Sequence, residues 1–337
     1  MASLKYRNLG RTGVKVSELC LGTMLFGDDT SPEEADKIVN RSLDAGINFI
    51  DTANVYVRGR SEEVLGDILK RNGKRESVVL ATKVFGTMDD DDPNMQGCSR
   101  RHIIQQCDRS LQRLQTDWID LYQIHRPDSQ VAIDETLEAL DQLIRWGKVN
   151  YIGTSTYAAW QLVESLWVSE KRALNRFVCE QPPYHLLDRR IERELIPMAQ
   201  TYGFGLIPWS PLAGGFLTGK YSREGDQPDN ARYSDAQGRG QHLLSEENFK
   251  VLDVVEAIAK EKDCTVTQVA LAWCKDQPAI TSPIIGPRTM DQLEDNLGAV
   301  DVEITDEDRK RLDEVAPPGS NTTPYYEADF GPHPHRV

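Results

Sequence analysis

The sequence has no long apolar run, few cysteines for its length and too few basic residues to balance its acidic ones. No stretch approaches the ~18 consecutive apolar residues of a spanning helix, and the N-terminal MASLKYRNLG lacks the apolar core of a secretory signal. The six cysteines form no CxxC pair, which disfavours disulfide scaffolds, zinc ribbons and c-type haem. The net charge of −14 would repel nucleic acid and anionic lipid. We therefore expect a cytoplasmic protein with no nucleic-acid or membrane partner.

Short apolar runs recur along the chain, and amphipathic stretches separate them. The runs are Leu19–Thr23, Phe49–Asp51, Val78–Thr82, Ile119–Ile124, Val149–Gly153, Phe177–Glu180, Gly205–Trp209 and Ile280–Ile285. Near-continuous apolar runs are typical of parallel strands that are covered on both faces. Eight strand–helix units predict a closed (β/α)8 TIM barrel, and the absence of GxGxxG after the first run argues against a doubly wound fold.

Capping residues mark where the helices begin and end. The first helix is predicted to start after Ser31, with Pro32 at its first position and Glu34 closing a capping box, and to stop at Gly46. Further helices are predicted over Ser99–Leu114, Ile133–Trp146, Thr289–Leu297 and Thr305–Ala316.

The chain, residues 1–337, is predicted to be a single barrel domain. A hairpin at about 5–17 precedes the barrel at about 19–299, and a C-terminal helix and tail occupy 304–337. Residues 213–243 are rich in Gly, Asp, Arg and Gln, and we expect them to form a loop.

Polar side chains follow three neighbouring strands at their C-terminal ends, where barrel enzymes carry their catalytic groups. Asp51 ends the second strand, with Tyr56 in the loop after it, Lys83 follows the third and His125 the fourth. A phenol is a weak proton donor at neutral pH, but a neighbouring ammonium favours its phenolate, and a carboxylate can hold that ammonium. An imidazole can orient a carbonyl oxygen. Such a site would protonate an alkoxide that forms at a carbonyl, and it would need a separate hydride donor.

Six segments carry a resemblance to a known family. They are FIDTANVYVRGRSEEVLG (49–66), VLATKVF (79–85), WIDLYQIHRPD (118–128), GTSTYAAW (153–160), WSPLAGGFLTGKY (209–221) and IIGPRTMDQLEDNL (284–297). In this order they resemble the aldo-keto reductase superfamily, in particular its bacterial-type reductases and the branch with the potassium-channel β-subunits. The resemblance implies a barrel whose bottom the hairpin closes, and NADPH-dependent reduction of aldehydes or ketones. It also implies a catalytic tetrad of Asp51, Tyr56, Lys83 and His125, with Tyr56 as general acid/base.

The resemblance further implies that NADP(H) is the cofactor. Thr23 and Asp51 would approach the nicotinamide ribose, Ser155 and Gln181 would hold the carboxamide, and Trp209 would stack on the ring. The pyrophosphate would lie along Ser210, Pro211, Leu212, Gly214 and Lys220, and the adenosine end against Gly286, Arg288, Gln292, Asp295 and Asn296. Arg288 stands at the start of a predicted helix, where both its charge and the helix N-terminus suit a 2′-phosphate.

Two positions depart from the family pattern, and the substrate pocket is only outlined. Thr156 stands where many reductases have Asn, and Val57 stands where Gly is common. Phe26, Phe85, Arg126 and Trp209 follow or end strands at the active rim and are expected to line the substrate pocket. The aromatic residues suit an apolar or sugar-ring substrate, whereas the arginine suits a carboxylate or a phosphate.

The sequence bears on two functions other than a carbonyl reductase. One is an NADP-binding regulatory subunit with little turnover, like the channel β-subunits; His125 argues against it, because those subunits have a different residue there. A metal-dependent hydrolase lacks a His/Asp cluster after the first strand, and neither Asp89–Asp92 nor His333 with His335 offers a full ligand set, so no metal is predicted. Oligomerisation is compatible with the sequence, but no residue pattern specifies it.

The C-terminal tail contains more aromatic residues than a solvated tail needs. Residues 317–337 include Tyr325, Tyr326 and Phe330, and such residues are scarce in disordered segments. In aldo-keto reductases this segment commonly crosses the barrel mouth. We therefore expect the tail to fold back over the rim near Trp209 and Phe26.

Overall fold

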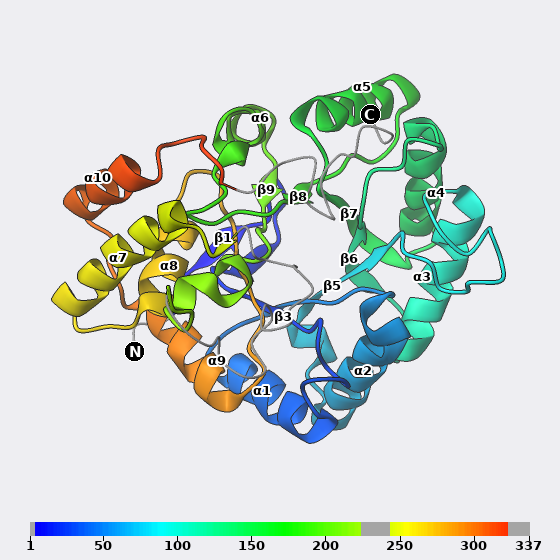
Figure 1. The fold of residues 1–337 in the computed structure, drawn as a ribbon. Helices are drawn as coiled ribbons and strands as arrows, with labels where there is room; N and C mark the ends of the chain where they lie inside the picture. The colour runs from blue at the N-terminus through cyan, green and yellow to red at the C-terminus, as the bar shows by residue number, and fades with distance from the viewer. Residues whose placement is uncertain (1–3, 224–242, 323–337) are drawn as a thin grey trace.

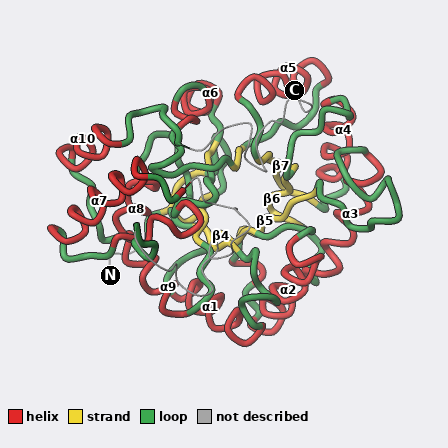
Figure 2. Tube along the Cα trace, in the orientation of Figure 1, coloured by secondary structure: helices red, strands yellow, loops and turns green. Residues whose placement is uncertain are grey.

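Eight parallel strands form one sheet in this computed structural model, which describes residues 4–223 and 243–322. The strands are β3 (Cys20–Gly22), β4 (Phe49–Asp51), β5 (Val79–Val84), β6 (Ile119–Ile124), β7 (Val149–Ser155), β8 (Cys179–Gln181), β9 (Gly205–Leu206) and β10 (Ile284–Ile285). Their order is β10-β3-β4-β5-β6-β7-β8-β9, so each strand follows its predecessor around the sheet. Figure 2 shows them in an inner ring with the helices outside. The predicted (β/α)8 barrel is confirmed.

The ring closes between β9 and β10, which are shorter than the apolar runs that predicted them. Leu206 pairs with Ile280 in a parallel bridge, and the Ile284 N–H donates to the Pro208 carbonyl at 2.8 Å. Pro208 and Pro283 have no N–H to donate, so a regular ladder cannot run through either of them. Isolated backbone hydrogen bonds therefore join the two ends of the sheet.

The helices surround the sheet (Figure 1). They are α1 (Pro32–Asp44), α2 (Arg60–Asn72), α3 (Arg100–Leu114), α4 (Ile133–Arg145), α5 (Ala159–Arg172), α6 (Leu195–Tyr202), α7 (Glu246–Glu261), α8 (Val266–Lys275), α9 (Met290–Leu297) and α10 (Asp306–Val315). Two helices, α7 and α8, lie between β9 and β10, where the sequence predicted one, and α7 packs against α10. None of the helices in the described residues is long and apolar enough to cross a membrane.

The start of α1 confirms one half of the predicted capping box and corrects the other. The Ser31 hydroxyl accepts a hydrogen bond from the Glu34 N–H at 3.2 Å, as an N-cap should. The Glu34 carboxylate, however, accepts from the Met290 N–H at 3.0 Å and from the Lys37 ammonium. Glu34 thus satisfies the first turn of α9, a segment far away in the sequence, instead of closing its own helix.

The N-terminal hairpin closes the bottom of the barrel. Its strands β1 (Tyr6–Asn8) and β2 (Lys15–Ser17) pair antiparallel. Leu9 and Val16 are fully buried and share a hydrophobic cluster with Phe49 and Leu121 from the barrel strands. Burial of these two side chains keeps water out of that end of the barrel, as the resemblance implied.

The two irregular segments are described only in part. Residues 213–218 form a short 3-10 helix, η4 (Ala213–Thr218), where a loop was expected, and residues 224–242 lie outside the described part. Near the C-terminus, the Ser320 carbonyl accepts from the Arg189 N–H at 2.8 Å, and the Thr322 N–H donates to Leu187 at 3.0 Å. The tail therefore reaches the loop after β8. Its aromatic residues, Tyr325, Tyr326 and Phe330, lie outside the described residues.

Candidate active site

Three adjacent strands bring the predicted tetrad together at their C-terminal ends. The Lys83 ammonium lies between Asp51 and Tyr56: it donates to the Asp51 carboxylate, to the Thr52 carbonyl at 3.0 Å and to the Tyr56 hydroxyl at 3.1 Å. The rings of Tyr56 and His125 meet edge to face, with their centroids 5.7 Å apart. A carboxylate, an ammonium, a phenol and an imidazole are thus in sequential contact.

The ion pair of Lys83 and Asp51 is almost completely buried. Burial by itself would lower the pKa of the Lys83 ammonium, but the negative charge of Asp51, together with Tyr56, more than offsets it and raises the pKa above its usual value. Lys83 is therefore a permanent cation beside the Tyr56 oxygen. A buried ion pair is weak evidence for a role in stability, and its position against the phenol indicates a chemical role.

His125 is held as a neutral imidazole. Burial lowers its pKa well below the usual value, and the positive charges of Lys83 and Arg126 lower it further. The backbone N–H of His125 donates to the Val84 carbonyl at 2.9 Å, which holds the residue next to the end of β5. A neutral imidazole can donate one hydrogen bond without adding a second charge to the site.

Two side-chain amides complete the surroundings of Asp51, and neither was predicted from the sequence to contact it. Gln123 and Gln181 each donate from Nε2 to Oδ2 of Asp51 at 2.9 Å. Gln123 was missed altogether, although it lies two residues before His125 on β6 and therefore points to the same side of the strand. Nε2 of Gln181, which was expected at the carboxamide, also lies 3.3 Å from the side-chain oxygen Oε1 of Gln123. The Asp51 carboxylate is thus held by the Lys83 ammonium and two amides.

Thr23 lies in a buried hydroxyl network behind the tetrad. Its Oγ1 is 2.9 Å from Oγ of Ser61, and that oxygen is 3.0 Å from Oγ1 of Thr52. Ser61 also donates to the Thr23 carbonyl at 2.7 Å. This network joins the ends of β3 and β4 to the start of α2.

The expected pyrophosphate segment forms a glycine-lined turn. Ala213, Gly214 and Gly215 all have positive φ angles, of 50°, 64° and 98°. A Cβ atom at Gly215 would lie 2.8 Å from Nζ of Lys220, so a larger residue here would push the ammonium away from the backbone. Two N–H groups of this turn are already used within it, because Ala213 donates to the Ser210 carbonyl and Gly215 donates to the Leu212 carbonyl, each at 2.9 Å. Ser210, Pro211 and Leu212 lead directly into the turn, and the Lys220 ammonium beside it is the group that fits a pyrophosphate.

At the expected adenosine end, most polar groups already have partners in the protein. Arg288 faces Asp29 at 3.6 Å, and its N–H donates to the Gln292 side chain at 2.8 Å. Asp295 accepts from the Thr265 hydroxyl at 2.7 Å and so is tied to the start of α8, while Asn296 is buried. The space next to Gly286 is open. Arg288 can meet a phosphate here, but that phosphate would compete with Asp29.

A model of the aldo/keto reductase family matches residues 18–317. The chain belongs to this family. It is 42% identical over 332 residues to the Uncharacterized oxidoreductase YrpG of Bacillus subtilis (strain 168), a match that covers 96% of this chain and 99% of that protein. It is also 37% and 36% identical over 304 residues to the Probable voltage-gated potassium channel subunit beta of Oryza sativa subsp. japonica and of Arabidopsis thaliana, covering 89% of this chain and 92% of each. The resemblance read from the sequence is confirmed.

Membership of the aldo/keto reductase family supports the assignment of this chain as an oxidoreductase, and members of this family generally bind NAD(P)H.

The two residues that depart from the family pattern share one backbone feature. Val57 has φ 47° and Thr156 has φ 64°, both in the left-handed region that β-branched residues rarely adopt. Gly and Asn, the residues common at these positions in the family, are the ones that tolerate this region best. The structure thus gives a backbone reason for the family preference.

The residues expected to line the substrate pocket of this aldo/keto reductase differ in their burial and contacts. Phe26 is only 1% exposed and packs with Ile38 and Val64 in the core under α1 and α2, so it does not line an open pocket here. Phe85 and Trp209 are partly exposed. Arg126 donates to the His125 carbonyl and to Oγ1 of Thr156, both at 2.8 Å, and so joins the end of β6 to the turn after β7.

Another buried carboxyl, that of Glu180, lies next to that turn and was not anticipated. It accepts hydrogen bonds from the Thr154 hydroxyl and from the Tyr157 N–H at 3.1 Å. Burial raises its pKa to about 8, although these hydrogen bonds and the charge of Arg126 act in the opposite direction. Ser155, expected at the carboxamide, donates to the Gln181 carbonyl at 2.9 Å just above it. Glu180 therefore supports the backbone of the expected nicotinamide site.

Proposed function

We propose that this aldo/keto reductase is a cytoplasmic enzyme that reduces aldehydes or ketones to alcohols with NADPH. The proposal rests on one observation: the Lys83 ammonium contacts both the Asp51 carboxylate and the Tyr56 hydroxyl. A buried cation beside a phenol has little structural purpose, but it can stabilise the phenolate that remains when the phenol gives up its proton. The neutral imidazole of His125 lies beside this phenol and can donate a hydrogen bond to the carbonyl oxygen of a substrate.

Each residue of the tetrad has a separate role in the proposed reaction. When bound, NADPH supplies a hydride to the carbonyl carbon. The carbonyl oxygen gains the electron pair of the C=O π bond, and Tyr56 donates its hydroxyl proton to that oxygen. The Lys83 cation stabilises the phenolate that remains, Asp51 keeps Lys83 in place, and His125 donates a hydrogen bond to the same substrate oxygen. A proton from solvent then restores the phenol.

The cofactor contacts are proposed on the family match and on local chemistry. The Lys220 ammonium beside the turn at Ala213–Gly215 suits a pyrophosphate, and Arg288 suits a 2′-phosphate, which favours NADP(H) over NAD(H). Ser155, Gln181 and Trp209 line the expected nicotinamide end, Thr23 and Asp51 the ribose, and Gln292, Asp295 and Asn296 the adenosine. The substrate is a small carbonyl compound that contacts Phe85, Arg126 and Trp209.

A second candidate is an NADP-binding subunit with little turnover, which the similarity to potassium channel β-subunits favours. A screen separates the two candidates. NADPH consumption is followed by absorbance over a panel of aldehydes, ketones, keto-sugars and quinones, with Tyr56→Phe as the matched inactive variant. Turnover that depends on Tyr56 supports the reductase. Tight NADPH binding without turnover on any member of the panel would instead support the subunit.

A further inference from the structure

Helix α5 carries two of the most exposed large apolar side chains among the described residues. Trp160 and Trp167 are 60% and 61% exposed, although the inward side of the same helix, including Leu162 and Ser165, is buried. Two adjacent exposed indoles form an apolar patch of the kind that marks an interaction surface. The barrel itself does not require them, because they face away from the core.

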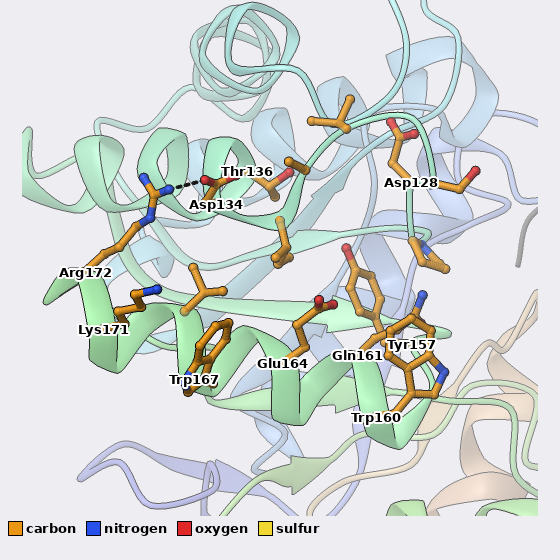
Figure 3. Close-up of a pocket in the computed structure, with 16 residues that line it drawn as sticks. Asp128, Asp134, Thr136, Tyr157, Trp160, Gln161, Glu164, Trp167, Lys171 and Arg172 are labelled. Atoms are coloured by element: carbon orange, nitrogen blue, oxygen red, sulfur yellow. Dashed lines mark hydrogen bonds and ion pairs between the residues drawn. The ribbon is translucent and has the colours of Figure 1, made fainter.

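The two indoles border a groove between α4 and α5. The groove has a volume of about 530 Å³. Figure 3 shows Trp160, Glu164 and Trp167 of α5 along one side of it. Its other wall comes from the loop after β6 and the start of α4, including Val131 and Asp134. Apolar surface from Val131 and Val168 lines it between the charged groups. The groove is therefore wide enough for side chains from another helix.

The exposed stripe of α5 has the spacing of a coiled-coil seam. Trp160, Glu164, Trp167 and Lys171 are separated by four, three and four residues, and all four are exposed. This is the alternation of d and a positions that lets one helix pack along another at a shallow angle. A seam position filled by a charged residue is stable only where a complementary group faces it.

The two charges of the seam have no ion-pair partner among the described residues. Glu164 forms no ion pair within residues 4–223 and 243–322, and the Lys171 ammonium only lies over the Trp167 ring, 4.9 Å from its centroid. The neighbouring Arg172, in contrast, is paired with Asp134 and Glu138. The seam therefore presents one acid, one base and two aromatic rings that remain available to a partner.

We propose that the partner is a second copy of this chain, which packs its α5 antiparallel against α5 of the first. With a two-fold axis midway between Glu164 and Trp167, Trp160 faces Lys171 of the partner subunit, and Glu164 faces Trp167 of the partner subunit. Antiparallel coiled coils place a and d positions in the same layer in this way. The first pair is a cation–π contact and the second lets an indole N–H donate to a carboxylate.

The seam also explains why the pairing is antiparallel and isologous. A parallel arrangement would set Glu164 against Glu164 and Lys171 against Lys171, and like charges in one layer repel each other. In the antiparallel arrangement each Lys171 lies between two indoles, Trp167 of its own chain and Trp160 of the partner subunit. One helix pair is a small interface, so the dimer should be reversible.

Sedimentation velocity of the full chain over a range of concentrations tests the dimer. We expect a concentration-dependent dimer for the wild type, and at least a roughly tenfold weaker dimer for Trp160→Ala and for Trp167→Ala, since buried tryptophans dominate such interfaces. Trp146→Ala is the matched control, because Trp146 is 51% exposed and also lies near a lysine, Lys148, but outside the groove. A monomer at every concentration, or a dimer that Trp167→Ala leaves unchanged, overturns the proposal.

Disulfide formation between copies tests the register. The two copies of position 164 are offset by only ~4.5 Å along the helix axis, whereas those of position 170 are offset by ~13.5 Å, at ~1.5 Å of rise per residue. Glu164→Cys should therefore form an intermolecular disulfide under mild oxidation and Glu170→Cys should not. Equal cross-linking of both variants overturns the antiparallel register.

Discussion

Val57 and Thr156 stand in two different loops of the site and share a left-handed backbone, with φ angles of 47° and 64°. Val57 directly follows Tyr56, and Thr156 directly follows Ser155. Each such conformation costs a β-branched residue roughly 1–3 kcal/mol. The turns that present the phenol and the expected carboxamide contact are therefore both strained, and the surrounding structure must hold them.

Relief of this strain should stabilise the protein. We expect Val57→Gly and Thr156→Asn each to raise the free energy of unfolding by on the order of 1 kcal/mol, because Gly and Asn accept positive φ more readily. Denaturant unfolding measures the change. Val55→Gly is the matched control: Val55 has φ −80°, so glycine there should destabilise. If Val57→Gly destabilises as much as the control, the strain does not exist.

Loss of the phenol should stop the chemistry without affecting the cofactor. We expect Tyr56→Phe to lower kcat by ~10²–10⁴-fold, the usual contribution of a general acid. NADPH affinity, measured by quenching of tryptophan fluorescence, should stay almost unchanged, because the hydroxyl contacts Lys83 and not the expected cofactor residues. Turnover like that of the wild type would rule out Tyr56 as the proton donor.

Loss of the ammonium should affect both rate and stability. Lys83→Met should be similarly slow, and it should also cost roughly 3–5 kcal/mol of stability, since it leaves the Asp51 carboxylate buried without its cation. Thermal unfolding followed in parallel distinguishes the two effects. A slow variant with an unchanged melting temperature would show that Asp51 does not depend on Lys83 for its burial.

Arg288 and Asp29 should have opposite effects on cofactor choice. A charge-assisted contact to phosphate contributes ~1.5–3 kcal/mol, so Arg288→Ala should raise the Kd for NADPH at least about tenfold more than the Kd for NADH. Asp29→Ala should instead lower the Kd for NADPH, because it removes the carboxylate that faces Arg288 at 3.6 Å. Equal changes for both cofactors would show that neither residue reads the 2′-phosphate.

Glu180 should make stability depend on pH. Its pKa is about 8 in the folded protein against an ordinary value of 4.5, so between these two values the folded state holds a proton that the unfolded state has lost. The free energy of unfolding must then fall as pH rises through this window, by up to ~4 kcal/mol between pH 5 and 8. Glu180→Gln, which keeps the shape, should remove that part of the slope, whereas Glu170→Gln on the surface should not. Parallel slopes for the wild type and Glu180→Gln would contradict the raised pKa.

Removal of the C-terminal tail should change substrate binding and selectivity more than cofactor affinity. Deletion of residues 323–337 leaves the contacts of Ser320 and Thr322 with the loop after β8 in place. If the deleted aromatic residues cover the rim, KM and the ranking of substrates should change, while NADPH affinity and melting temperature should change little. Unchanged kinetics over several unrelated carbonyl compounds would mark the tail as a passive extension.

The barrel and the clustering of Asp51, Tyr56, Lys83 and His125 could be predicted because their signals are local. Apolar runs such as Ile119–Ile124 reveal parallel strands by composition, and Ser31, Ser99 and Thr305 cap the helices that were expected to follow them. Since all strands of a parallel barrel end at the same rim, Asp51, Lys83 and His125 had to come together once the strand ends were known.

Only the tertiary structure decided which polar groups became partners across the barrel. The carboxylate of Glu34 caps α9 instead of α1, Asp29 faces Arg288, and Gln123 shares Asp51 with Gln181. Each of these contacts joins segments that are distant in the chain, and many side chains could make it equally well. Periodicity determines which face a residue lies on, but the partner of a buried polar group depends on which other segment packs there, and burial then makes that pairing obligatory.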